Sequence, residues 1–233
     1  MARPTLSMND HAHVYNRGVD KRIIFNSSAD YARFIHTLYL SNDIEYVAVN
    51  YIRANQDIDS LNVESSTLNI HKHSGRRLVD ILCFTLMPNH YHLLLRQVVE
   101  NGIPRFMHRV NTAYTNFFNL KNERTGSLFE GRYKYKIITN EQYLVYLSQY
   151  IHLNPIKIIE PGWKEKGISD WKQANAFLEN YKWSSYQDYI GVKNFPSVIN
   201  PGLLEEYYKK PEEYKKFVNS YLVQDIESIK NCI

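Results

Sequence analysis

An apolar stretch interrupted by a single Pro-Asn dipeptide is the strongest constraint on the fold of this chain. Residues 81–87 and 91–95 are mostly apolar, and the Pro-Asn between them is typical of a turn. We therefore predict a β-hairpin over residues 78–96. Because strand side chains alternate between faces, His90 and His92 should point to the same side of its second strand. Two imidazoles on one face of a rigid strand form half of a divalent-metal site.

The His-x-His spacing does not identify a metal site by itself, because it occurs three times. His11-Ala12-His13 opens a predicted strand at about residues 11–17, where ordinary packing explains both histidines. His71-Lys72-His73 lies in a polar insert at about residues 53–77, where solvent exposure explains both. Partial burial would also account for His90-Tyr91-His92, unless another segment supplies a further ligand and a reactive group.

Residues 139–155 have the pattern of an amphipathic helix. Thr139 and Gln142 match a capping box at its start. Pro155 predicts that the helix ends at about residues 153–154. The apolar stripe that should pack on a sheet consists of Leu144, Leu147 and Ile151.

A neighbouring stripe of the same helix carries polar tips. Tyr150 and Asn154 are four residues apart, so they share one face at about 6 Å along the axis. A phenol and an amide can therefore face outward together from the last turn. The chain holds 19 tyrosines, so packing alone would explain any single one. The complete stripe is Tyr143, Tyr146, Tyr150 and Asn154.

Together these motifs resemble those of the HUH single-tyrosine transposases, especially the branch that includes the REP-associated tyrosine transposases. The resemblance rests on Met-Pro-Asn-His-x-His at residues 87–92 and Tyr-Ile-x-x-Asn-Pro at residues 150–155. It spans roughly residues 11–190, with its motifs in the expected order. The further matching segments are residues 13–18, 126–132 and 183–186.

The resemblance implies a role for each matching residue. His90 and His92 would be metal ligands, and Asn154 would complete a site for Mg²⁺ or Mn²⁺. Tyr150 would attack a phosphate in single-stranded DNA, forming a 5′-phosphotyrosine link and a free 3′-hydroxyl. The activity implied is that of a transposase, or of a domesticated relative, acting on DNA that contains a hairpin. A monomer and a homodimer are both compatible with these motifs.

Two other functions fit the same residues. The chain could be a catalytically silent nucleic-acid-binding module with an RRM-like sheet. It could also be a metal-dependent hydrolase that activates water and leaves Tyr150 unused.

The charge pattern favours a nucleic-acid partner. The net charge of +4 is only mildly basic. Lysines and arginines are nevertheless concentrated between the His90–His92 pair and the predicted helix that carries Tyr150. Cations alternate with aromatics over residues 132–136, which suits phosphate pairing together with base stacking, although a charged edge strand would look similar. The predicted DNA-binding residues are Arg17, Arg105, Arg109, Arg124, Arg132, Tyr133, Lys134 and Lys136.

Strands interleaved with helices predict an α+β fold, which the resemblance specifies as a ferredoxin-like or RRM-like antiparallel sheet with helices packed on it. The expected domains are a nuclease domain over residues 1–160 and a helical C-terminal extension over residues 161–233. Two cysteines and no apolar run of about 18 residues predict a cytoplasmic, nucleoid-associated protein with no membrane partner. The expected elements are strands at about 11–17, 44–52, 78–96 (the hairpin) and 132–138, and helices at about 28–41 and 103–121.

Overall fold

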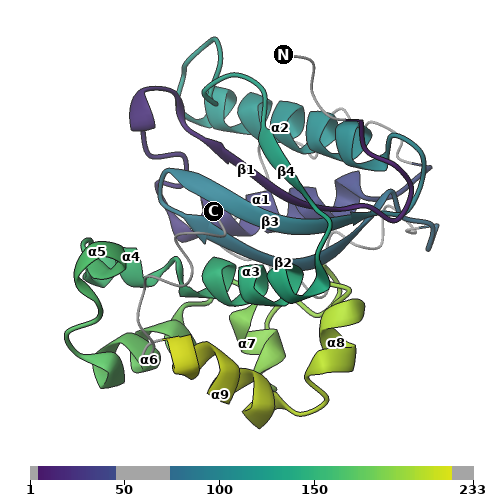
Figure 1. The fold of residues 1–233 in the computed structure, drawn as a ribbon. Coiled ribbons are helices and arrows are strands. Elements are labelled where there is room, and N and C mark those ends of the chain that lie inside the picture. The colour runs from purple at the N-terminus through teal and green to yellow at the C-terminus, as the bar shows by residue number, and fades with distance from the viewer. Residues whose placement is uncertain (1–4, 46–73, 222–233) are drawn as a thin grey trace.

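A four-stranded antiparallel sheet in the order β2-β3-β1-β4 forms the centre of the computed structural model, which describes residues 5–45 and 74–221 (Figure 1). Helix α1 (Ser28–Ser41) links β1 to β2, and helix α2 (Gly102–Lys121) links β3 to β4. This order of strands and crossovers is the ferredoxin-like arrangement, so the predicted α+β fold is confirmed. The strands are β1 (His11–Arg17), β2 (Val79–Met87), β3 (His90–Gln97) and β4 (Lys134–Ile138).

The predicted hairpin is present. Met87 pairs with His90 across a two-residue turn formed by Pro88 and Asn89. Strand β3 pairs with β2 on one side and with β1 on the other, so both of its edges are occupied. This double pairing fixes which β3 side chains face each side of the sheet.

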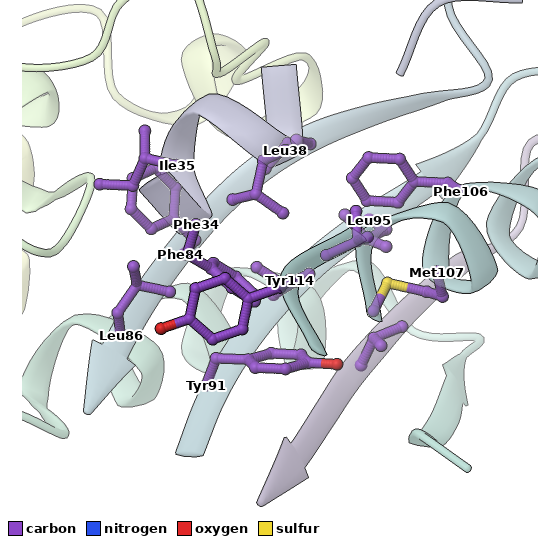
Figure 2. Packing of buried hydrophobic residues seen from close by; sticks show 14 of the residues in the cluster. Phe34, Ile35, Leu38, Phe84, Leu86, Tyr91, Leu95, Phe106, Met107 and Tyr114 are labelled. Atoms are coloured by element: carbon purple, nitrogen blue, oxygen red, sulfur yellow. The ribbon is translucent and has the colours of Figure 1, made fainter. Parts of the chain in front are cut away.

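One face of the sheet packs against α1 and α2 to form the main core (Figure 2). Tyr91 of β3 and Tyr114 of α2 are fully buried there, and burial of an aromatic side chain of this size contributes about 1.5–3 kcal/mol. Each phenol keeps a hydrogen bond: Tyr91 Oη donates to Asn111 at 2.8 Å, and Tyr114 Oη donates to the carbonyl of Ile24 at 2.5 Å. The face of α2 that packs in this core includes Phe106, Val110, Tyr114 and Phe118, which are all buried.

A close approach at the start of α2 requires glycine. A Cβ atom at Gly102 would lie 2.2 Å from the carbonyl oxygen of Leu78. Any larger residue would therefore push α2 away from β2.

The opposite face of the sheet packs against helix α3 (Glu141–Leu153). Its predicted apolar stripe is confirmed, because Leu144, Leu147 and Ile151 are buried against residues of β2 and β3. The predicted cap at Thr139 is wrong by one residue. The N-cap is Asn140, because its side-chain oxygen accepts the backbone N–H of Tyr143 at 3.0 Å.

The described part of the C-terminal segment is helical and packs beneath α3 (Figure 1). Its third hydrophobic cluster surrounds Trp163, whose side chain is 1% exposed. None of the helices in the described ranges is both long and apolar enough to cross a membrane. The helices that follow α3 are α4 (Ile156–Ile159), α5 (Trp163–Lys166), α6 (Trp171–Asn180), α7 (Tyr186–Tyr189), α8 (Leu203–Tyr207) and α9 (Pro211–Tyr221).

The Trp-Ser-Ser-Tyr motif at residues 183–186 covers the outer edge of β2. The backbone N–H of Leu86 donates to the carbonyl of Trp183 at 2.9 Å, and that of Ser185 donates to Phe84 at 3.0 Å. These bonds satisfy backbone groups that an edge strand would otherwise leave open.

His152 fastens α3 to this C-terminal segment. Its Nδ1 lies 2.6 Å from Tyr214 Oη, and its Nε2 lies 2.8 Å from Ser185 Oγ. The ring is completely buried, and burial lowers the pKa of His152 to about 3.

Two expectations fall largely outside the described residues. The strand predicted at about 44–52 begins at Ile44 and Glu45, which form a turn, and its remainder lies outside the described residues. The polar insert predicted at 53–77 is described only from Ser74, so His71 and His73 also lie outside.

The buried His152 should make the unfolding free energy depend on pH. Its folded pKa is about 3 and an unfolded histidine has a pKa near 6.5, so the unfolded chain binds the proton first as the pH falls. Stability should be full above about pH 6.5 and should decrease below it, with a cost of about 2 kcal/mol from this residue at pH 5. Urea unfolding of the wild type and of His152→Gln at pH 7.5 and pH 5 tests this. The difference between the two proteins should shrink by about that amount at pH 5, and an unchanged difference would contradict the assignment.

Candidate active site

Strand pairing places two histidines side by side on the α3 face of the sheet. Tyr15 of β1 is opposite His92 of β3, and His13 precedes Tyr15 by two residues on the same face. His13 Nε2 and His92 Nδ1 are 2.9 Å apart, and the two rings are stacked. His90 and His92 lie as predicted on one face, with ring centroids 5.1 Å apart. A row of three imidazoles therefore crosses from β1 to β3.

Tyr150 lies over this row, held there by α3 of the same chain. Its ring centroid is 6.1 Å from that of His92 and 6.5 Å from that of His13, edge-on to both. The other tyrosines of the stripe lie elsewhere: Tyr143 contacts Lys136, and Tyr146 is 52% exposed.

Asn154 and Tyr150 are connected through a lysine that follows them in the chain. Lys164 of α5 donates a hydrogen bond from Nζ to Tyr150 Oη at 2.7 Å and lies 3.4 Å from Asn154 Oδ1. Asn154 is 2% exposed, and its Nδ2 donates to the carbonyl of Tyr150 at 2.8 Å. The amide oxygen of Asn154 and the phenol oxygen of Tyr150 thus share one cationic neighbour.

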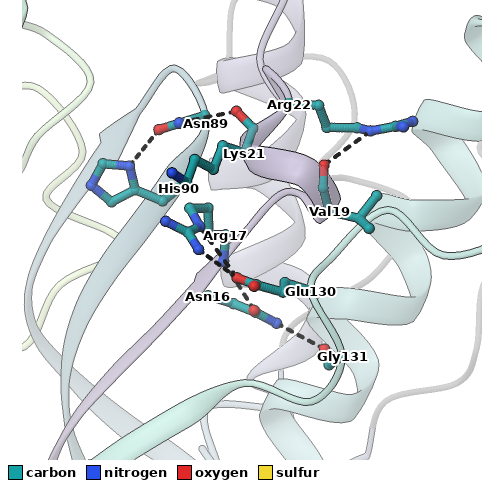
Figure 3. Close-up of polar contacts among 9 residues, drawn as sticks. All are labelled: Asn16, Arg17, Val19, Lys21, Arg22, Asn89, His90, Glu130 and Gly131. Carbon is teal, nitrogen blue, oxygen red and sulfur yellow. Dashed lines mark hydrogen bonds and ion pairs between the residues drawn. The ribbon is translucent and has the colours of Figure 1, made fainter.

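The tautomer of His90 follows from its neighbours (Figure 3). Asn89 Nδ2 donates to the carbonyl of Lys21 at 3.1 Å, which fixes the orientation of the Asn89 amide. Its Oδ1 therefore faces His90 Nδ1 at 2.6 Å, and because this oxygen only accepts, His90 Nδ1 carries the proton. The lone pair of His90 is consequently on Nε2, where a metal ion could bind it.

The histidines of the site are neutral at pH 7. Burial lowers the pKa of His13 to about 4, with further lowering by Lys136 and Lys164. Burial likewise lowers the pKa of His90 to about 4, and it lowers that of His92 well below its ordinary value. Every side-chain charge that acts on His90 is positive, and these charges belong to Lys157, Lys164 and Arg17. Neutral imidazoles surrounded by cations suit an anionic substrate.

Burial also affects the two hydrogen-bonded groups above the imidazoles. It raises the pKa of Tyr150, an effect that the charge of Lys157 opposes. It lowers the pKa of Lys164 to about 8, with Lys157 adding to the lowering, so that the ammonium form still predominates at pH 7.

The donor atoms fit a weakly held divalent cation better than a closed structural site. In residues 5–45 and 74–221, no group of three or more His, Cys, Asp or Glu is arranged to hold a metal ion. The protein ligands would be the imidazoles of His90 and His92, supplemented by an amide oxygen such as that of Asn154, with the remaining positions open to substrate oxygens. The pairing of His92 Nδ1 with His13 would orient its ring in the way that partners of metal-bound histidines do.

Two of the predicted DNA-binding residues share the face of the imidazoles. Lys134 and Lys136 of β4 are paired with Tyr15 and His13, and both lysines are exposed. Tyr133, by contrast, packs against the core on the opposite face.

The predicted arginines lie away from the imidazoles or are engaged by neighbouring groups. Arg17 pairs with Glu130 at 2.8 Å, as Figure 3 shows. Arg109 donates to the carbonyls of Ser41 and Asp43, which explains its presence without DNA. Arg124 donates to Asn119 and to the carbonyl of Ser127, whereas Arg105 is exposed on α2 and Arg132 is exposed before β4.

Sequence reasoning missed three residues of this site: His13, Tyr15 and Lys164. His13 stands in a His-x-His pair that spacing alone could not distinguish from packing residues. The pairing of β1 with β3 is what brings His13 and Tyr15 to His92. No signal marks Lys164 in a chain with 28 lysines and arginines.

The comparisons with known proteins agree with the motifs. Residues 42–154 match the model of a family described as "Transposase IS200 like". The matched segment is a little under half of the chain, and it contains His90, His92, Tyr150 and Asn154. The resemblance to the single-tyrosine transposases is confirmed.

A solved structure of a REP-associated tyrosine transposase bound to a REP hairpin is also similar. The alignment covers 86% of this chain and 90% of that chain, with 10% sequence identity and a TM-score of 0.47. Values this low transfer neither residues nor ligands to this chain. No curated protein matches the sequence.

Burial should keep the imidazoles of His13, His90 and His92 from titrating in the range where free histidines do. In the metal-free folded protein, their ring proton resonances should stay nearly constant from pH 8 to about pH 5.5. In the urea-unfolded chain, the same resonances should titrate near pH 6.5. Proton NMR, with each residue assigned through a single His→Gln variant, measures this. Titration of His92 near pH 6.5 in the folded protein would contradict the geometry described above.

Proposed function

We propose that this protein cleaves single-stranded DNA and transfers the strand through a covalent 5′-phosphotyrosine intermediate on Tyr150. The observation that carries the proposal is the position of the Tyr150 phenol over His92 and His13, on the face that also bears His90. The match of residues 42–154 to the IS200-like transposase family supports the same reaction class.

The reaction conserves the energy of the bond that it breaks. Tyr150 Oη forms a bond to the phosphorus, the bond from phosphorus to the 3′ oxygen breaks, and the phenol proton ends on that oxygen. Rejoining is the reverse, with a 3′-hydroxyl attacking the phosphotyrosine, so no nucleotide cofactor is needed. Forming the phenolate at pH 7 costs about 4 kcal/mol even for an unburied tyrosine, so the site must stabilise the developing charge.

His90, His92 and Asn154 are the residues that would hold Mg²⁺ or Mn²⁺. A bound divalent cation withdraws charge from the scissile phosphate and stabilises its oxyanions as a Lewis acid. The chain's own contribution is to keep the imidazoles neutral and oriented. His90 is oriented by Asn89, and His92 is oriented by His13.

The DNA would lie across the open part of the α3 face, beside β4. Lys134 and Lys136 would contact phosphates, and Tyr15, whose ring lies beside those of His13 and His92, would offer a surface for base stacking. A hairpin in the DNA would place the adjoining single strand on this surface. Because Tyr150 and the histidines meet within one chain, each chain would complete its own site whether it acts as a monomer or as a homodimer.

Incubating the protein with single-stranded DNA carrying a hairpin and with Mn²⁺ or Mg²⁺ should give a protein–DNA adduct that survives denaturation. Peptide mapping should locate the DNA on Tyr150. Tyr150→Phe should lose the adduct while binding DNA within about twofold of wild type, because only the nucleophile is removed. EDTA, His90→Ala and His92→Ala should each abolish cleavage, whereas His108→Ala, at an exposed position on α2, should cleave normally.

The other outcomes identify the alternatives. Cleavage by Tyr150→Phe would indicate a hydrolase that activates water. DNA binding without cleavage under either metal would indicate a binding module. An adduct on Tyr114, Tyr143 or Tyr146 would refute the choice of nucleophile.

The two β4 lysines should contribute to the salt dependence of DNA binding. Each phosphate contact with a single strand contributes about 0.7 to the slope of log affinity against log salt. Lys134→Ala and Lys136→Ala should therefore each lower the slope by about that amount, and Lys172→Ala, at an exposed position on α6, should not. Fluorescence anisotropy from 50 to about 300 mM salt, with a hairpin-bearing single strand, its full duplex and an RNA copy, tests this. Tighter binding to the plain duplex would contradict the proposed substrate.

A further inference from the structure

Lys164 donates a hydrogen bond from its Nζ to Tyr150 Oη, the oxygen that would attack the phosphate. The two atoms are 2.7 Å apart. Its ammonium also lies 4.2 Å from the centre of the Tyr150 ring. Tyr150 otherwise packs against the apolar cluster that includes Leu82, Leu94 and Ile151. A cation aimed at a nucleophilic oxygen therefore calls for a chemical explanation.

The placement of Lys164 is set by the residue before it. Trp163 is buried in one hydrophobic cluster with Leu153 and Ile156, so α5 is packed against the C-terminal end of α3 and against α4. The Lys164 side chain then extends from this anchor to Tyr150 Oη and Asn154 Oδ1. The lysine is thus fixed by a buried neighbour on a segment that lies beyond the family match, which ends at residue 154.

We propose that Lys164 is a catalytic residue that donates a hydrogen bond to the Tyr150 phenol oxygen throughout strand cleavage and rejoining. This inference rests on the proposed function. In cleavage, the ammonium would stabilise negative charge as it develops on Tyr150 Oη before the bond to phosphorus forms. In rejoining, Tyr150 Oη is the leaving group, and the same N–H would stabilise the charge that returns to it. Lys164 is neither consumed nor altered, so the atom balance given above is unchanged.

The proposal gives the C-terminal segment a chemical role. The imidazoles are on the sheet and the nucleophile is on α3, whereas the cation beside the nucleophile is on α5. A site assembled from residues up to 154 would contain the nucleophile without the donor to its oxygen.

Lys164→Met tests the proposal, because methionine keeps an apolar stem against Tyr150 and removes only the charged donor. Lys166→Met is the matched control, since Lys166 is exposed two residues later on the same helix. Single-turnover adduct formation at saturating Mn²⁺ should slow on the order of a hundredfold in Lys164→Met and should be unchanged in Lys166→Met. DNA affinity should change by no more than about twofold in either variant, and Lys164→Arg should restore part of the rate.

Two further readouts separate charge stabilisation from a merely structural role. In the metal-free protein, the ¹³Cζ resonance of Tyr150 should shift in Lys164→Met and not in Lys166→Met. Replacing Tyr150 by a fluorotyrosine, whose oxygen carries negative charge more readily, should shrink the rate loss caused by Lys164→Met. If Lys164→Met does not fold by circular dichroism, Lys164→Gln replaces it with the same expected results.

The possible failures can be told apart. A wild-type rate in folded Lys164→Met, or a faster one, would overturn the role of Lys164 and leave the proposed function intact. A wild-type protein that forms no adduct would overturn the proposed function and, with it, this inference.

Discussion

The pairing of β3 on both sides is the constraint on which the rest of the structure depends. Because β2 and β1 both hold this strand, Tyr91 and Leu93 must face the core while His90 and His92 face α3. A slip of one residue would place the imidazoles among the aromatic rings of the main core and turn Tyr91 and Leu93 toward α3. The same pairing brings His13 of β1 within hydrogen-bonding distance of His92. The core and the candidate active site are therefore two consequences of one register.

The electrostatics of the site follow from the burial of its bases. The imidazoles carry no charge at pH 7 and the charges of Lys157 and Lys164 act on His90, so the potential above the sheet favours a polyanion. The free energy cost of burying the Lys164 ammonium is partly offset by its hydrogen bond to Tyr150 Oη and by its cation–π contact with the Tyr150 ring. A phosphate that enters would be drawn toward the same place as a divalent cation ligated by His90 and His92. Substrate and metal would then assist each other's binding, as opposite charges do in a shared site.

The parts of this structure that could be predicted are those encoded by local periodicity. The Pro-Asn turn fixes the hairpin, and the spacing of Tyr150 and Asn154 fixes their common face, because both depend only on residues close in sequence. The cap of α3 was misjudged by one position, since Thr139 and Asn140 are both good caps and only the backbone conformation selects between them. His13 and Lys164 could not be predicted, because each reaches the site through a contact between segments distant in sequence. The position of His13 beside His92 depends on the pairing of β1 with β3. The position of Lys164 beside Tyr150 depends on where Trp163 is buried.

The bonds of His152 have a mechanical consequence for Tyr150. Both ring nitrogens of His152 are held by buried hydroxyls, and His152 stands two residues after Tyr150 and two before Asn154. Successive residues of an α-helix are separated by about 100° around the axis, so any rotation of α3 that moved Tyr150 away from His92 would also pull His152 off both partners. Rotation of α3 is therefore restrained by His152, from the side of the helix that faces the C-terminal segment. If Tyr150 acts as proposed, the part that moves between cleavage and rejoining would be the DNA strand, whose 3′ end would be exchanged over a stationary phosphotyrosine.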